Sequence, residues 1–139
     1  MSDRYPLNTN NALIVNIVVG WLFYFMAALF GEKTIWLGIA VIMVSLGNFI
    51  VHTFVFNIKV KTFYNAGMIT IWIFLAPCVC FFFYVVYSKN LISITDYLIG
   101  IPVGIGLNII AVLKMIDWFK DKNATYIFNQ RNLLPADRR

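Results

Sequence analysis

Length, composition and charge identify this chain as a small membrane protein. It has 139 residues, of which 61% are hydrophobic and 12% are charged, whereas a soluble domain has about 25% charged residues. These values exclude an ordinary water-soluble domain and indicate one membrane domain over residues 1–139. The formal net charge of +5 does not indicate nucleic-acid binding, because the aromatic residues lie inside apolar segments.

Four segments contain the roughly 20 mainly apolar residues that a membrane-spanning helix requires. They cover residues 11–30, 34–57, 67–87 and 96–119, and a polar tail follows at 120–139. The sequence therefore predicts an all-α membrane protein with four transmembrane helices, arranged as two helical hairpins. The first apolar run is longer than the hydrophobic region of a signal peptide, so we expect it to be retained as a helix.

Short polar stretches separate these segments and supply helix-starting residues. Thr34 is expected to cap the second helix, and Thr95 or Asp96 is expected to cap the fourth. Within the fourth helix, Gly100 and Gly104 are four residues apart. Small residues at this spacing let another helix approach closely.

The lysines and arginines are distributed unevenly between the two sides of the membrane. Eight fall on one side of the predicted topology and two on the other: Arg4, Lys59, Lys61, Lys120, Lys122, Arg131, Arg138 and Arg139 against Lys33 and Lys89. Basic residues accumulate in cytoplasmic loops. We therefore predict that both termini and the middle loop are cytoplasmic.

Several polar residues lie inside the apolar helices, where they normally face the interior of a bundle. The predicted topology places most of them at similar depth in the cytoplasmic half. We predict that a polar pocket opening toward the cytoplasm is lined by Asn16, Asn48, His52, Thr70, Asn108, Lys114 and Asp117. Asn48 and His52 are four residues apart, which places them on one face of an α-helix. The alternative is that the asparagines form structural hydrogen bonds between helices.

His52 is the only histidine and has two interpretations. It is either a structural residue or a general acid/base, in which case Asp117 would orient it. Asp117 has a competing partner in Lys114, three residues earlier, and Lys114 can instead extend toward the lipid headgroups. Cys78 and Cys80 are interpreted as packing residues. No metal or cofactor is expected, because the sequence lacks a cluster of ligands at suitable spacing.

We expect a binding protein more than an enzyme. The preferred function is to hold a lipid-like or amphipathic ligand, or a partner helix, at the cytoplasm-facing pocket, as an immunity-type or transporter-accessory protein would. One alternative is a membrane-embedded enzyme that uses His52 on a lipid-like substrate. Another is an oligomeric pore or transport subunit. The expected partners are membrane lipids and a membrane protein or second copy of the chain.

From Gly47 onward, over roughly the middle and second half of the chain, the sequence resembles a family of bacterial membrane proteins of unknown function named for an HXXEE motif. The resemblance rests on Gly47-Asn48 with His52, on the run Tyr64-Asn65-Ala66-Gly67-Met68-Ile69-Thr70, and on Pro77. Two features differ: Ala66 stands where the family has proline, and the naming motif is absent from the first helix. The resemblance implies a four-helix protein of the bacterial inner membrane, with no established activity.

Overall fold

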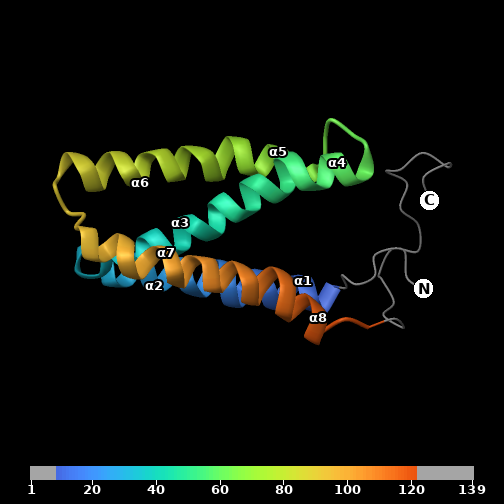
Figure 1. The fold of residues 1–139 in the computed structure, drawn as a ribbon, viewed down its shortest axis with the longest axis horizontal. Helices are drawn as coiled ribbons and strands as arrows, with labels where there is room; N and C mark the ends of the chain where they lie inside the picture. Colours follow the sequence, from blue (N-terminus) through green and yellow to red (C-terminus); the bar gives the residue numbers. More distant parts are fainter. Residues whose placement is uncertain (1–8, 122–139) are drawn as a thin grey trace.

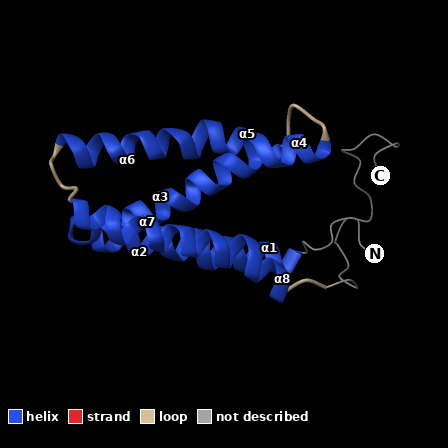
Figure 2. Ribbon diagram, viewed as in Figure 1, coloured by secondary structure: helices blue, strands red, loops and turns tan. Residues whose placement is uncertain are grey.

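The computed structural model describes residues 9–121, and this part of the chain is helical apart from turns and short loops (Figures 1 and 2). The predicted all-α fold is confirmed for these residues. Three helices in the described region are long and apolar enough to cross a membrane: Asn10–Lys59, Gly67–Ser88 and Ile94–Trp118. The predicted tail at 120–139 lies outside the described residues from position 122 onward.

The first helical run contains the candidate span Asn10–Lys59 of 50 residues and joins the first two predicted helices. It consists of α1 (Thr9–Val15), the π-helix η1 (Asn16–Leu22), α2 (Phe23–Phe30), the 3₁₀-helix η2 (Gly31–Thr34), α3 (Ile35–Ile50), the π-helix η3 (Val51–Val55) and α4 (Phe56–Val60). The prediction of four separate helices is therefore not confirmed. The reason is that residues Gly31–Thr34 keep helical hydrogen bonding where the sequence indicated a turn.

The run nevertheless folds back on itself at this 3₁₀ segment (Figure 1). Gly31 has a φ of 53°, in the region that glycine adopts most readily. The Tyr24 hydroxyl is hydrogen-bonded to Ser45 Oγ, so α2 lies beside α3. One helical run thus contains a sharp reversal of direction.

The second half of the described chain contains two further helices. The first comprises α5 (Ala66–Thr70), the π-helix η4 (Ile71–Leu75) and α6 (Ala76–Ser88). The second comprises α7 (Ile94–Asn108), the π-helix η5 (Ile109–Met115) and α8 (Ile116–Trp118). Their bounds agree with the predicted segments 67–87 and 96–119 to within two residues.

The tightest packing is between α3 and α7, which form the most extensive helix contact in the described residues. A Cβ atom added to Gly100 would lie 2.5 Å from the carbonyl oxygen of Trp36, and one added to Gly104 would lie 2.8 Å from that of Ala40. Both glycines are buried. The predicted close approach at this small-residue pair is confirmed, with α3 as the partner helix.

One end of the molecule, which we call the hairpin end, contains η2 and the loop between α6 and α7. Glu32 and Lys89 form an ion pair there, with Lys89 Nζ 3.6 Å from Glu32 Oε1. Asp96 Oδ1 accepts a hydrogen bond of 3.0 Å from the backbone N–H of Trp36. These contacts bring the starts of α3 and α7 together.

The helix caps at this end differ from those predicted. Ser93, rather than Thr95 or Asp96, caps α7, and Asp96 completes a capping box three residues later. Thr34 occupies the cap position of α3 without a side-chain cap hydrogen bond. Asp96 acts on α3 instead through its bond to Trp36, a contact that sequence spacing did not indicate.

The opposite end, which we call the loop end, contains α1, α4, α5 and α8 (Figure 1). Asn11 Nδ2 donates a hydrogen bond of 3.1 Å to the carbonyl oxygen of Ile116, so the start of α1 lies beside α8. All four π-helical segments, η1, η3, η4 and η5, lie in the parts of their helices nearest this end. The candidate site lies here.

Candidate functional site

His52 belongs to a hydrogen-bond network that fixes the loop between α4 and α5. Its Nδ1 lies 3.0 Å from Asn65 Oδ1, and its backbone carbonyl accepts a bond of 2.6 Å from Asn65 Nδ2. Asn65 Nδ2 also donates to Asn57 Oδ1 at 2.8 Å. The network therefore joins η3, α4 and the residue that caps α5.

The bonds of Asn65 determine which atom of His52 carries the proton. Both hydrogens of the Asn65 amide are used on oxygen atoms, so its Oδ1 is the acceptor toward His52 and toward the backbone N–H of Gly67 at 3.1 Å. An acceptor requires a donor opposite, so His52 carries hydrogen on Nδ1. In the neutral ring, Nε2 is then the atom with the free lone pair.

Gly67 packs directly against the imidazole. A Cβ added at Gly67 would lie 2.2 Å from His52 Nδ1, a distance that no side chain tolerates. The ring also contacts Phe56 edge-to-face, with centroids 4.9 Å apart. His52 is half-buried and held on two sides, which is the setting of a residue that positions a loop.

A groove of about 530 Å³ lies next to this network. It is lined by Thr53, Phe54, Asn57, Ile58, Lys61, Thr62, Phe63 and Met68. Thr53 Oγ1 is buried and has no hydrogen-bond partner among the described residues. Asn57 links the groove to the network, because its Nδ2 donates to Thr53 O at 3.1 Å and its Oδ1 accepts from Asn65.

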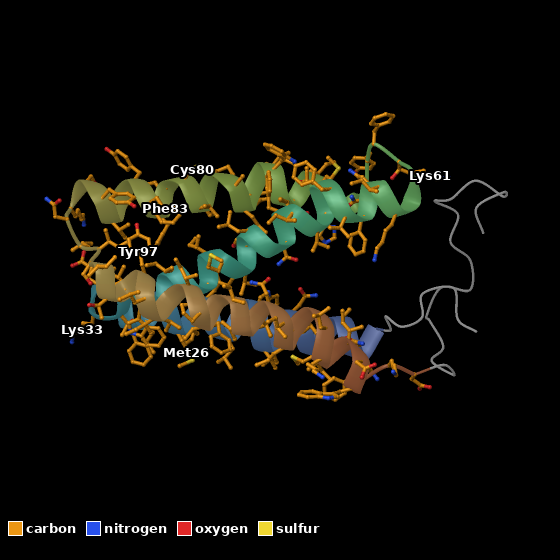
Figure 3. All side chains as sticks on the ribbon, in the orientation of Figure 1. Met26, Lys33, Lys61, Cys80, Phe83 and Tyr97 are labelled. Atoms are coloured by element: carbon orange, nitrogen blue, oxygen red, sulfur yellow. The ribbon has the colours of Figure 1, made fainter. Side chains whose placement is uncertain are left out.

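The groove combines apolar walls with a basic rim. Ile58 and Phe54 are exposed on the surface of the chain, and Phe63 is 100% exposed at the tip of the loop. Lys61, which adopts a left-handed φ of 52°, lies on the loop at the opposite end of the molecule from Lys33 (Figure 3). Such a surface suits a molecule with an apolar body and an anionic or polar head.

Among residues 9–121, two of the predicted site residues hydrogen-bond only within their own helix. Asn16 is exposed and donates to Ala12 O at 2.8 Å, and Asn48 donates to Val44 O at 3.2 Å. Asn48 precedes η3, in which hydrogen bonding changes from the α to the π pattern. Asn48 and His52 still lie about one turn apart, but Asn48 bonds within α3 whereas His52 bonds to Asn65 in the loop.

Asn108 lies in the contact between α3 and α7. Its Nδ2 donates to Met43 O at 3.0 Å and to Gly104 O at 2.9 Å. A Cβ added at Gly47 would lie 2.0 Å from Asn108 Oδ1, so the amide fills the space that this glycine leaves open. This geometry is that of a hydrogen bond between helices, the alternative considered for the asparagines.

The remaining predicted site residues are exposed at the ends of their helices. Asp117 forms an ion pair with Lys120, and Lys114 and Thr70 lie on the surface of η5 and α5. Among the described residues, no hydrogen bond joins any two of the seven predicted pocket residues. Of these seven, the network includes His52 alone.

Sequence reasoning missed Asn57 and Asn65, which carry most of the network. A signal was present for Asn65, because an asparagine directly before a helix is a favoured cap, and its side chain does accept from Gly67 N. The position of Asn57 in the sequence did not indicate a hydrogen bond to the loop. Its role follows from the left-handed turn at Lys61, which brings the chain back over α4.

The chain is an all-helical protein with three helices apolar enough for a membrane among the residues described, which is consistent with the membrane class indicated by composition. Residues 1–82, more than half of the chain, match the family described as a protein of unknown function with HXXEE motif. The chain belongs to this family. No curated protein and no solved structure matches it.

The matched stretch confirms the family resemblance and changes its extent. It contains all the residues on which the resemblance rests, from Gly47 to Pro77, and it extends back through α1 and α2. It ends at residue 82, within α6, so α7 and its contact with α3 lie outside it. The chain has a single histidine and a single glutamate, Glu32, so the motif that names the family is absent.

Proposed function

We propose that this protein is a membrane-embedded binding protein that holds an anionic, lipid-like ligand in the groove at the loop end. The observation that carries the proposal is the position of the groove. It adjoins the His52–Asn65–Asn57 network and has a volume of about 530 Å³, within the ~300–1,000 Å³ typical of sites for small ligands. His52 and Asn65 would position the loop that forms one wall.

The chemistry of the groove supports an amphipathic ligand. Thr53 offers a buried hydroxyl with no hydrogen-bond partner among the described residues, and a buried polar group without a partner is costly. Lys61 supplies a positive charge at the rim, and Phe54 and Ile58 supply apolar contact. A ligand with an acidic head and a hydrocarbon tail would satisfy all of these groups.

The proposal includes four membrane crossings, with both termini in the cytoplasm of a bacterial inner membrane. Its support is the reversal at Gly31, since 50 residues at ~1.5 Å per residue are far longer than one crossing of ~30 Å. Further support comes from two contacts between different helical runs, the Glu32–Lys89 pair at the hairpin end and the Asn11–Ile116 bond at the loop end. The excess of basic residues on the loop-end side favours the cytoplasm for that side.

The binding proposal can be tested by native mass spectrometry of protein released from nanodiscs of mixed phosphatidylglycerol and phosphatidylethanolamine. The wild type is expected to retain phosphatidylglycerol. Lys61→Gln should lower its apparent affinity about fivefold, since one lysine near an anionic surface contributes about 1 kcal/mol. Lys59→Gln is the matched control, because Lys59 is exposed and lies outside the groove lining.

Two outcomes would contradict the proposal. If the wild type retains no phosphatidylglycerol, the groove does not bind this class of ligand. If Lys59→Gln weakens retention as much as Lys61→Gln, the effect is general attraction of anionic lipid to a basic loop. Groove-specific binding requires the two variants to differ.

A further inference from the structure

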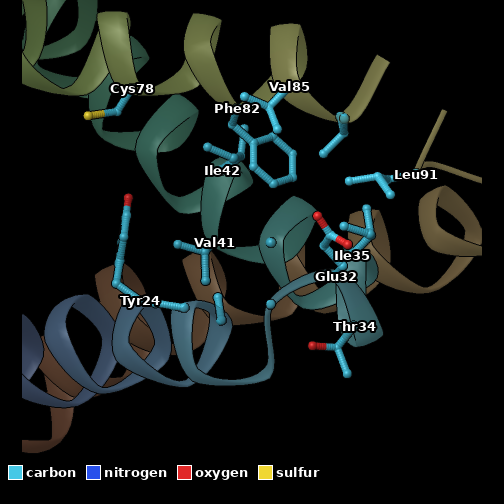
Figure 4. Close-up of a pocket in the computed structure, with 15 residues that line it drawn as sticks. Tyr24, Glu32, Thr34, Ile35, Val41, Ile42, Cys78, Phe82, Val85 and Leu91 are labelled. Atoms are coloured by element: carbon cyan, nitrogen blue, oxygen red, sulfur yellow. The ribbon is translucent and has the colours of Figure 1, made fainter. Parts of the chain in front are cut away.

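A second cavity lies at the hairpin end, away from the proposed ligand groove. Residues from α2, η2, α3 and α6 surround it (Figure 4). Its volume is about 340 Å³, at the lower end of the ~300–1,000 Å³ range for ligand sites. Val41, Ile42, Phe82 and Val86 give it apolar walls.

Such a cavity needs an occupant in a membrane. Apolar cavities do not hold water well, because water needs two to four polar partners. An empty space of this size also deprives its lining of dispersion contacts. The surrounding hydrocarbon chains of the bilayer are the nearest material able to fill it.

The polar groups around the cavity are unevenly placed. Deep between the helices, the Tyr24 hydroxyl already has a partner in Ser45. At the hairpin, Glu32 and Thr34 also line the space. Thr34 Oγ1 is buried with no hydrogen-bond partner in the described part of the chain, and Glu32 is paired with Lys89. The end near η2 therefore presents one carboxylate and one unused hydroxyl, and Lys89 lies outside the cavity lining beside Glu32.

We infer that this cavity holds one acyl chain of a zwitterionic phospholipid, with the headgroup at η2. The ammonium group of phosphatidylethanolamine complements Glu32, and its phosphate complements Lys89. The Thr34 hydroxyl supplies a hydrogen-bond donor for the oxygens that join chain and head. The site is distinct from the groove at the loop end and differs from it in lipid class.

Photocrosslinking in nanodiscs tests this inference. The probe is phosphatidylethanolamine with a diazirine near the end of one acyl chain, and peptide mass spectrometry locates the adducts. We expect adducts at Val41, Ile42 and Phe82. Ala28→Phe fills the cavity that Ala28 lines and should remove these adducts. Ala12→Phe is the matched control, because both alanines are exposed and helical but Ala12 lies outside the cavity lining.

Glu32→Gln provides a second test that leaves the cavity volume unchanged. It should reduce adducts from the phosphatidylethanolamine probe and leave those from a phosphatidylglycerol probe with the same chain unchanged. Equal labelling by both probes in the wild type would overturn the headgroup assignment. Labelling spread evenly over outward residues such as Phe25 and Phe81, and unaffected by Ala28→Phe, would overturn the site itself.

The two lipid proposals can fail independently. Retention of phosphatidylglycerol depends on Lys61 at the loop end, whereas the acyl-chain adducts depend on Ala28 and Glu32 at the hairpin end. Circular dichroism of each variant checks that helix content is retained. An Ala28→Phe protein that keeps its helices and still labels at Phe82 contradicts the cavity proposal alone.

Discussion

The two ends of the molecule are held together by different kinds of contact. At the hairpin end, helices meet through glycines and backbone atoms, as Gly100 does against Trp36 O, and through the capping box at Ser93 and Asp96. At the loop end, helices change to π-helical hydrogen bonding, and side-chain amides tie the loop to η3. Close contact of these glycines with backbone oxygens and with the side chains of Ile39 and Met43 leaves little room for adjustment, whereas amide contacts can be exchanged for a ligand. The comparison explains why a ligand that competes with protein contacts is proposed at the loop end, whereas the lipid chain at the hairpin end occupies a cavity that is already present.

The largest expected effect is loss of the α3–α7 contact. Gly104→Ala places a methyl group 2.4 Å from Met43 Cβ and 2.8 Å from Ala40 O. The helices must separate, at a cost of about 1–3 kcal/mol for overpacking. Thermal unfolding in detergent should show a clear decrease in midpoint. Gly106→Ala is the control, since nothing lies within 4 Å of its added Cβ, and an equal decrease there would refute the close-contact explanation.

Asn65→Ala should have the next largest effect, confined to the loop end. It removes two donated and two accepted side-chain hydrogen bonds, and because the loop can open locally, their loss lowers the stability of the loop more than the midpoint of global unfolding. Trypsin should then cleave after Lys61 much faster than in the wild type. Asn48→Ala, which loses only a bond within its own helix, should leave cleavage unchanged. Slow cleavage of Asn65→Ala would show that the network does not hold the loop.

Substitutions of His52 distinguish its structural and chemical roles. Asparagine can donate from a position close to Nδ1, so His52→Asn should retain most of the protection of Lys61 from trypsin. His52→Gln reaches further and His52→Ala has no donor, so both should lose about 1 kcal/mol of loop stability. If all three variants are cleaved at the wild-type rate, the bond from Nδ1 to Asn65 does not stabilise the loop.

The smallest effect is expected at the surface of the hairpin end. Lys89 and Glu32 have side chains that are 60% and 65% exposed, and exposed ion pairs contribute about 0–1 kcal/mol. Lys89→Gln should therefore change the unfolding midpoint little, and added salt should reduce the difference further. A decrease as large as that of Gly104→Ala would mean that the pair, rather than the glycines, holds this end together.

The sequence predicted the helical class and the small-residue contact because both follow from local composition. Apolar runs of sufficient length define helices in lipid. Gly100 and Gly104 indicate a close helix–helix approach, but they do not show which helix is the partner. The family resemblance was also recognisable from residues such as His52 and Gly67.

The candidate site was harder to predict, because depth along a helix does not determine direction around it. Asn16, Asn48 and Asn108 lie at predicted depths that suggested one pocket, yet their amides bond to different backbone carbonyls. Asn48 and His52 lie about one turn apart, yet Asn48 bonds to Val44 O within α3 and His52 bonds to Asn65 in the loop. The reversal at Gly31 was expected as a turn between helices, but its continuous helical hydrogen bonding was not.

The distance along the chain between α3 and α7 has a consequence for biosynthesis. Ala40 and Met43 meet Gly104, so the tightest surface of α3 has no partner until about 60 further residues have been made. During synthesis, the surface of α3 that later packs against α7 must therefore face lipid or an insertion factor. If the ribosome stalls in the α6–α7 loop, that surface of α3 stays exposed. Insertion of α7 is therefore the step that completes the α3–α7 contact.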